Sequence, residues 1–235
     1  MRAGKKLLFC PIGIAVFVLL YFFLIQNTKA DAETDVKTTY KKGFYYEPIP
    51  TSVKKVMRGV SYQKNDVVEW KDLCHVVVKH YNFSGKVKTG ELIVNEKIAQ
   101  DVVEIFYELY KQKYPIKSIK LIDYYDADDE KSMEANNTSA FNFRYVTGSS
   151  TKVSMHGMGL AIDINPRINP YVKGKTILPK NAKVYKNRNK KTCKGKYASA
   201  MIDADDEIVT LFKEHGFSWG GDWNSLKDYQ HFEYK

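Results

Sequence analysis

Short apolar runs separated by polar turns predict several strands. Residues 74–79, 91–94 and 119–122 are rich in apolar and β-branched side chains, which is typical of strands. Between the first two runs, residues 81–86 read Tyr-Asn-Phe-Ser-Gly-Lys and predict a turn. The chain is therefore expected to contain a sheet whose successive strands are joined by short connections.

Two stretches have the spacing of amphipathic helices. Apolar residues recur every three or four positions over residues 98–109, and Pro115 marks the end of this helix. A second helix is predicted to begin near Asp203 and to end at Gly216. Acids in its first turn and His215 near its end suit the helix dipole. Helices packed on an antiparallel sheet define the expected fold class, α+β.

Two other segments alternate between apolar and polar side chains. In residues 160–165 the polar face carries Asp163 beside small or polar neighbours. In residues 141–145, Phe-Asn-Phe-Arg-Tyr, the polar face carries Asn142 and Arg144. A period of two predicts half-buried strands. An acid beside small side chains leaves room for a bound group at that acid.

A histidine close to this acid indicates a metal site. His156 lies seven residues before Asp163, and Gly157 and Gly159 allow the chain between them to fold back. A third candidate ligand, His231, lies in an alternating run at the C-terminus. Imidazole nitrogen and carboxylate oxygen are both ligands that zinc accepts.

An additional acid, Asp228, lies three residues before His231. Positions three apart on a strand face opposite ways, so Asp228 must lie in a bend if both serve one site. Three ligands that leave one metal position open, with an unligated carboxylate as base, fit a hydrolytic zinc centre. Glu233 shares the strand face of His231 and is placed to orient it. The alternative is that all these are ordinary strand and turn residues.

The order of these residues resembles that of the bacterial cell-wall zinc peptidases, the D-alanyl-D-alanine carboxypeptidase and L-alanyl-D-glutamate endopeptidase family. This family shares its fold with hedgehog signalling domains. The shared pattern is Ser-x-His, an Asp seven residues after the His, and a late acid-x-x-His. The similarity extends from about residue 70 to the end. Its flanking matches are residues 141–144, Asn165-Pro, residues 169–171 and the Trp-Gly-Gly-Asp-Trp run at 219–223.

The resemblance implies an α+β domain with an antiparallel sheet, packed helices and a zinc cleft. It implies one Zn²⁺ per chain, held by His156, Asp163 and His231. By the same resemblance Asp228 is the catalytic base, Arg144 holds a substrate carbonyl or carboxylate, and Ser154 contacts the substrate through its hydroxyl. The implied reaction is hydrolysis of a peptide bond in peptidoglycan stem peptides.

Two bonds are candidates: the L-alanyl-D-glutamate bond, and the terminal D-alanyl-D-alanine bond that a carboxypeptidase trims. Within the resembled family, an Asp three residues before the last His ligand is typical of the endopeptidases. Asp228 therefore favours the L-alanyl-D-glutamate bond. A different class of function is a non-catalytic zinc-containing domain that binds the cell wall. A further alternative is a basic adhesion protein whose zinc pattern arose by chance. An unligated acid such as Asp228 favours an enzyme.

The N-terminus predicts export. Basic residues precede an uncharged apolar run at 7–25, which is long enough to nearly span a bilayer. Residues 1–30 are expected to form a signal or transmembrane anchor, 31–55 a tether, and 56–235 the zinc peptidase domain. The predicted location is extracytoplasmic and membrane-anchored, the alternative being secretion after cleavage at Ala32.

Charge and the remaining side chains add a few expectations. The formal net charge is +10, and residues 180–196 hold seven Lys and one Arg. This Lys180–Lys196 run predicts a solvated loop that attracts anionic wall polymers. Nucleic acid is the other polyanion that a basic protein could bind, and the export signal argues against it. The acidic residues at 126–130 lack the glycine and spacing of a calcium loop and predict a solvated loop. Whether Cys74 and Cys193 pair stays open.

Overall fold

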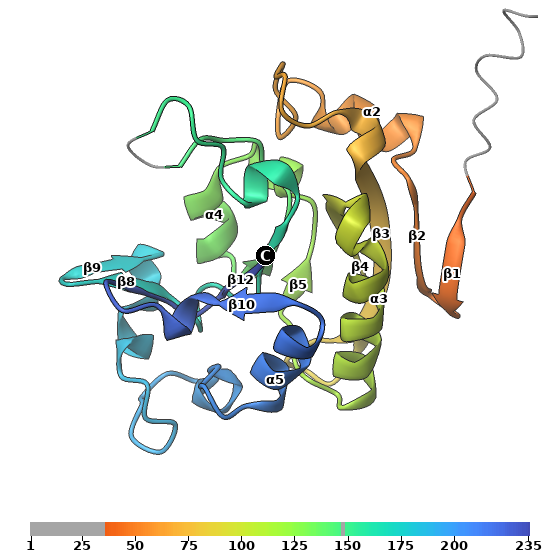
Figure 1. Ribbon diagram of the computed structural model, residues 1–235. Helices are drawn as coiled ribbons and strands as arrows, with labels where there is room; N and C mark the ends of the chain where they lie inside the picture. The colour runs from red at the N-terminus through yellow and green to blue at the C-terminus, as the bar shows by residue number, and fades with distance from the viewer. Residues whose placement is uncertain (1–35, 147–148) are drawn as a thin grey trace, which may run out of the picture. The chain divides into compact units, whose positions relative to one another are not determined.

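A four-stranded antiparallel sheet contains the longest strands of the fold (Figure 1). The computed structural model describes residues 36–146 and 149–235. Neighbouring strands in the sheet follow chain order: β1 (Thr38–Lys41), β2 (Phe44–Pro48), β3 (Leu73–Tyr81) and β4 (Val87–Asn95). The strands predicted at 74–79 and 91–94 are confirmed as β3 and β4, which pair along their whole length.

The long helix α3 (Glu96–Lys111) follows β4 directly and packs on this sheet (Figure 1). It begins at Asn95, whose side-chain oxygen accepts a hydrogen bond from the Lys97 N–H and so satisfies a free donor of the first turn. One face of the helix is buried, as the spacing predicts. The buried residues are Ile98, Ala99, Val102, Val103, Ile105, Phe106 and Leu109.

Three smaller sheets complete the fold. Two are antiparallel, with strand orders β10 (Phe217–Trp219), β12 (His231–Tyr234), β7 (Ala161–Asp163) and β11 (Lys227–Asp228), β8 (Tyr171–Lys173), β9 (Thr176–Leu178). The third pairs β5 (Ser118–Ile119) with β6 (Asn137–Thr138) in parallel. The fold is thus mixed α and β with antiparallel sheets, as predicted, and the parallel pair is an addition to that prediction.

The other helices within residues 36–146 and 149–235 are short. The α-helices are α2 (Thr51–Met57), α4 (Asp129–Glu134) and α5 (Glu207–Glu214). The 3₁₀ turns are η1 (Trp70–Asp72), η2 (Ile122–Tyr125), η3 (His156–Met158), η4 (Lys180–Lys186), η5 (Ala198–Ala200) and η6 (Gly220–Asp222). The predicted C-terminal helix is confirmed as α5, although it begins at Glu207 and not near Asp203.

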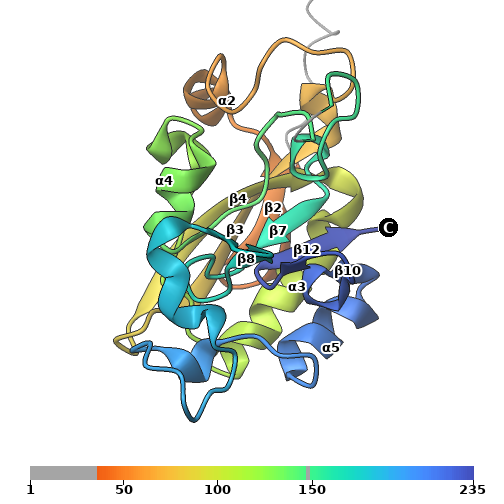
Figure 2. The same cartoon turned by 90° about the vertical axis from the view of Figure 1, so that its left-hand side faces the viewer.

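One hydrophobic core joins the large sheet to the β10–β12–β7 sheet. Its members come from β3, β4, α3, α5 and from the strands around residues 162 and 232. Phe232 of β12 stacks on Phe212 of α5, with ring centroids 4.0 Å apart. Figure 2 shows β7, β12 and β10 side by side, with α5 next to β10. The small sheet is therefore held rigidly against the larger one.

Part of the predicted tether is folded. The sequence predicts a tether over 31–55, whereas residues 38–48 form β1 and β2 and α2 begins at Thr51. Phe44 is buried, and its ring packs edge-on against Tyr107 of α3 at 5.2 Å. The lysines that make this stretch look like a linker lie on and beside the edge strand β1, where charge blocks further strand pairing.

One local prediction is wrong and two are only partly right. Residues 141–145 form no strand beyond an isolated bridge at Tyr145, and of the run 119–122 only Ile119 lies in a strand, β5. The acidic stretch near 126–130 leads into helix α4, which Asp128 caps by accepting the Lys131 N–H. In each case polar side chains bind nearby backbone or charge, a competition that hydrophobic periodicity does not reveal.

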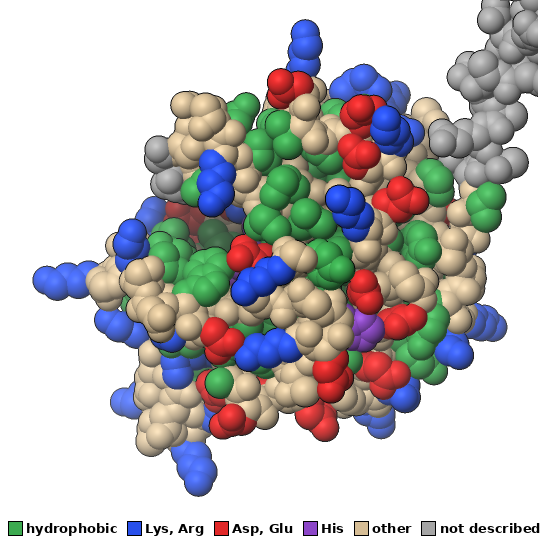
Figure 3. Space-filling model, in the orientation of Figure 1, with side chains coloured by type: hydrophobic (Ala, Val, Ile, Leu, Met, Phe, Trp, Pro, Cys, Tyr) green, Lys and Arg blue, Asp and Glu red, His purple; other side chains and the backbone are tan. Residues whose placement is uncertain are grey.

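The basic run at 180–196 is not a simple solvated loop. It includes η4, and Tyr185 is buried. Arg188 donates to the carbonyls of Ile168 and Ile202 and stacks on the Tyr229 ring, while Lys190 pairs with two aspartates. On the face in Figure 3, basic and acidic side chains are mixed over the centre, and basic side chains project at the left and lower edges. The attraction to anionic wall polymers stays a prediction.

The predicted membrane-anchored, extracytoplasmic location is withdrawn. None of the helices in the described part of the chain is both long and apolar enough to cross a bilayer. The apolar run at 7–25 and the cleavage pattern at Ala32 lie outside the described residues.

Cys74 and Cys193 are both free thiols, so the pairing left open by the sequence does not form.

Phe44→Ala tests whether residues 38–48 belong to the folded unit. Because the ring is fully buried against α3, we expect the free energy of unfolding to fall by about 3–5 kcal/mol. The matched control is Val36→Ala, at an exposed position, with an expected change below about 0.5 kcal/mol. Chemical denaturation measures both. Equal stability of the two variants would contradict the packing described for β2.

Candidate metal centre

The pairing of β7 with β12 sets two of the three candidate ligands opposite each other. In this antiparallel pair Asp163 is the direct partner of His231, Ile162 of Phe232 and Ala161 of Glu233. Directly opposed side chains on one face have Cβ atoms about 4.5–5.5 Å apart. The apolar partners on the other face, Ile162 and Phe232, are fully buried and hold this register.

The turn η3 brings the third ligand to the same place. The Ser154 hydroxyl accepts the Gly157 N–H at 2.9 Å and so closes the turn that carries His156. Gly159 has a φ of +71°, and a Cβ there would meet the Asn95 backbone nitrogen at 2.7 Å. The loop therefore turns sharply against the end of β4. The predicted folding back of His156 toward Asp163 is confirmed.

Three ligand atoms converge on one point. His156 Nε2 lies 3.2 Å from Asp163 Oδ1 and 3.2 Å from His231 Nδ1. His231 Nδ1 lies 3.1 Å from Asp163 Oδ1. Zinc bonded at its usual distances to N and O ligands would separate neighbouring ligand atoms by about 3.4 Å in a tetrahedron. The observed triangle is close to one face of such a tetrahedron.

The second ring nitrogen of each histidine is held by an acceptor. His156 Nδ1 lies 2.6 Å from the Ala140 carbonyl oxygen, to which it donates. His231 Nε2 lies 3.2 Å from Glu233 Oε2, so Glu233 takes the orienting position predicted for it. With these protons placed outward, both inner nitrogens present lone pairs to the same point. That arrangement is typical of histidines that bind a metal.

The electrostatics of the site also favour a bound cation at the point where the three ligand atoms meet. The two histidines outweigh the effect of burial and hold the pKa of Asp163 well below its usual range. Burial alone would lower the pKa of His231, but the hydrogen bonds to Asp163 and Glu233 raise it to about 10. Two inner nitrogens 3.2 Å apart repel unless a proton or a metal ion lies between them. The donor set thus fits zinc.

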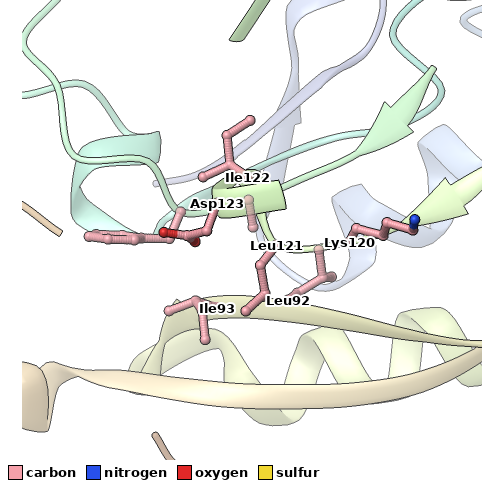
Figure 4. Close-up of a pocket in the computed structure, with 8 residues that line it drawn as sticks. Leu92, Ile93, Lys120, Leu121, Ile122 and Asp123 are labelled. Atoms are coloured by element: carbon pink, nitrogen blue, oxygen red, sulfur yellow. The ribbon is translucent and has the colours of Figure 1, made fainter. Parts of the chain in front are cut away.

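A dense layer supports the Ala140 carbonyl that orients His156. The next residue, Phe141, donates its N–H to the Ile93 carbonyl of β4 at 3.1 Å and is itself buried. Figure 4 shows Leu92 and Ile93 of β4 facing the segment 120–123, with Leu121 above them. The crevice between these residues leaves no room for a water molecule. Packing therefore fixes the position of the Ala140 carbonyl, which orients His156.

Asp228 lies beside the ligands but outside the group they form. It ends β11, and the bend at Tyr229–Gln230 separates it from β12, as the sequence predicts. A Cβ on Gly220 would approach Asp228 Cβ to 2.9 Å and His231 Cβ to 3.3 Å, so glycine is required there. Burial, together with the charge of Asp163, raises the pKa of Asp228 to about 6 against the opposing effect of His231.

Arg144 and Ser154 have other partners in the structure. The Arg144 Nε donates to Asp129 Oδ2 at 2.8 Å, and Asn142 donates to the other oxygen of that carboxylate at 3.0 Å. Arg144 nevertheless lies against the metal loop, because its backbone carbonyl accepts the Ser154 N–H at 2.9 Å. Ser154 closes η3 and is not a candidate metal ligand. Substrate contact by either residue stays a prediction.

The other three histidines lie outside the candidate metal site, and the two tryptophans near it have different positions. Among the described residues, His75, His80 and His215 belong to no metal-ligating group. His215 caps α5 and binds Asp101 of α3, in agreement with the sequence prediction. The Trp223 ring lies 5.3 Å from that of His231 and walls the site, whereas Trp219 is buried.

Sequence reasoning missed three supporting groups: the Ala140 carbonyl, Asp129 and Gln230. A backbone acceptor carries no signal in the sequence. Asp129 stands in an acidic run without a visible partner. Gln230 stands between two site residues, Asp228 and His231, and that position is the one signal that would have drawn attention to it.

Comparison with known families agrees with this geometry. A family model described as D-alanyl-D-alanine carboxypeptidase matches residues 147–234, which include the three ligand candidates and Asp228. This is a family of zinc-dependent peptidases. The predicted resemblance to it is confirmed over these residues. No solved structure matches the chain.

His156→Ala tests the ligand set. Removing one of three converging ligand atoms leaves two, so we expect zinc content after dialysis to fall from about one per chain to a small fraction. His215→Ala is the matched control and should retain the metal, since its ring binds Asp101. Elemental analysis of the purified proteins measures both. Equal zinc in the two variants would contradict the assignment.

Proposed function

We propose that the protein is a zinc-dependent peptidase that hydrolyses peptidoglycan stem peptides. The single observation that carries this proposal is the convergence of His156 Nε2, Asp163 Oδ1 and His231 Nδ1 beside an acid, Asp228, that is not part of their group. The family match over 147–234 supports the reaction class and suggests the substrate.

The proposed chemistry divides the work between the bound ion and the chain. A zinc ion held by the three ligands would supply Lewis-acid chemistry for the scissile carbonyl and the attacking water. Asp228 accepts the proton of the attacking water and delivers it to the leaving amine. A carboxyl group with a pKa near 6 suits both steps, because it gains and loses a proton close to neutral pH.

A non-catalytic zinc-containing wall-binding domain is the rival of another class. Such a domain gains nothing from a half-buried carboxylate whose ionised form is destabilised by burial. Retaining Asp228 beside the ligands costs stability without adding a metal bond. An enzyme that needs a base at this point explains the residue, and a binding module does not.

For the bond that is cut, we propose the L-alanyl-D-glutamate linkage. A carboxypeptidase must hold a free terminal carboxylate with a cation whose charge is not already compensated. The charge of Arg144 is compensated by Asp129 at 2.8 Å, which favours contact with a neutral backbone carbonyl. Ser154 accepts a hydrogen bond from Gly157, which leaves its hydroxyl proton available to a second substrate carbonyl.

Trimming of the terminal D-alanine is the second candidate. The observation that favours it is the description of the matching family model, D-alanyl-D-alanine carboxypeptidase. Both reactions use the same metal ligands and the same base, so the ligand geometry does not separate them. The proposed preference for the L-alanyl-D-glutamate bond rests on Arg144 and Ser154, the residues proposed to hold the substrate.

Asp228→Asn separates the base from the metal ligands. We expect this variant to keep its zinc and to lose about 10²–10⁴ in kcat, the usual contribution of a general base. In the wild type the base is active only when deprotonated, so kcat/KM should rise with pH through about 6. Zinc analysis and a pH–rate profile measure these effects. Loss of the metal in Asp228→Asn would make Asp228 a ligand instead.

Digestion of purified peptidoglycan identifies the bond. Mass spectrometry of the released peptides should show a new D-glutamate N-terminus and an unchanged D-alanine content, because cleavage after L-alanine leaves the far end of the stem intact. The metal-deficient His156→Ala protein is the control. Release of free D-alanine with the L-alanyl-D-glutamate bond intact would reverse the choice of bond.

A further inference from the structure

Gln230 is a buried amide next to the proposed base. Its side chain is 2% exposed, and its Nε2 donates to Asp228 Oδ1 at 3.0 Å. The same nitrogen lies 3.6 Å from the Met133 sulfur of α4. The amide oxygen has no hydrogen-bond partner among the described residues. Burying an unpaired amide oxygen is costly, so the donor end of this amide has a role that offsets the cost.

The backbone around this amide is clamped from several sides. The Gln230 carbonyl accepts the Ile164 N–H at 2.9 Å, which ties it to the end of β7. The preceding carbonyl, that of Tyr229, accepts the Trp219 indole N–H at 2.9 Å. Arg188 stacks on the Tyr229 ring at 4.3 Å. Because the backbone is fixed, the position of the amide relative to Asp228 is fixed as well.

The two contacts of Nε2 also set the orientation of the amide. An amide nitrogen has two protons, and here one points to Asp228 and the other to Met133. Rotating the amide by half a turn would place its oxygen against the carboxylate oxygen, where two acceptors repel. The ionised form of Asp228 therefore selects the orientation in which Gln230 donates.

We propose that Gln230 is a positioning residue that directs proton transfer to the Oδ2 atom of Asp228. This inference rests on the proposed function, in which Asp228 is the general base. A carboxylate oxygen that already accepts an N–H is the weaker base of the two. The proton of the attacking water is then taken by Oδ2, and Gln230 keeps the carboxylate from rotating and exchanging its oxygens.

Replacing Gln230 by Met keeps the length and the apolar contact with Met133 but removes the donor. A hydrogen bond to a charged group contributes enough that kcat is expected to fall about 10- to 100-fold. KM and zinc content should change by less than about twofold, because the amide nitrogen bonds to Asp228 and Met133 and not to a metal ligand or Arg144. Met133→Leu is the matched control. It leaves the bond to Asp228 in place, and kcat should stay within about twofold of the wild type.

A double-mutant cycle distinguishes positioning from a structural role. In the Asp228→Asn background no base remains to be positioned, so adding Gln230→Met should change the residual kcat by less than about twofold. A further large loss in this background would mean that Gln230 acts on the fold or the metal, and would overturn the inference. Wild-type kcat in Gln230→Met would overturn it as well.

A second variant covers the case in which Gln230→Met does not fold. Gln230→Glu keeps the shape and places an acceptor where the donor was, so kcat at neutral pH should fall at least as far as in Gln230→Met. Unchanged kcat in this variant would also overturn the inference. If Asp228→Asn alone keeps full activity, the assignment of the base fails and this inference fails with it. If Asp228→Asn is inactive while the Gln230 variants are normal, this inference fails alone.

Discussion

The cross-strand pairing of Asp163 with His231 is the constraint on which the rest of the site depends. A carboxylate and an imidazole lie opposite each other because Ile162 and Phe232, on the other face, are buried in the core. Shifting either strand by one residue would turn the ligand on that strand into the core. The register of two short strands therefore decides whether a metal centre exists.

The surrounding groups convert this pair into a specific donor set. The Ala140 carbonyl and the Glu233 carboxylate take the outer protons of the two histidines, which leaves two inner lone pairs and one carboxylate oxygen around a common point. Their own positions are secured by the contact of Phe141 with β4 and by the alternation of β12. The large sheet and α3 thus act as a fixed support for a small polar site.

The candidate ligands and the long helix were predictable, because local patterns in the sequence indicate which side chains share one face of a strand or helix. The alternation at 160–165 and the spacing of His156, Asp163 and His231 indicated the ligands, and the helical period indicated α3. The predictions that failed concern polar segments. Residues 38–48 resemble a linker because an edge strand carries lysines, and Arg144 resembles a free surface cation because its partner, Asp129, is fifteen residues earlier in the chain. Neither pairing leaves a periodic signal.

The central claim is that two specific ring nitrogens and one carboxylate oxygen bind a single zinc ion. Anomalous diffraction at the zinc absorption edge, from crystals of the zinc-loaded protein, tests it most directly. The account predicts one peak about 2.0–2.2 Å from each of three atoms: His156 Nε2, Asp163 Oδ1 and His231 Nδ1. A peak bonded to Asp228, or to the outer nitrogen of either histidine, or no peak near these residues, would contradict it.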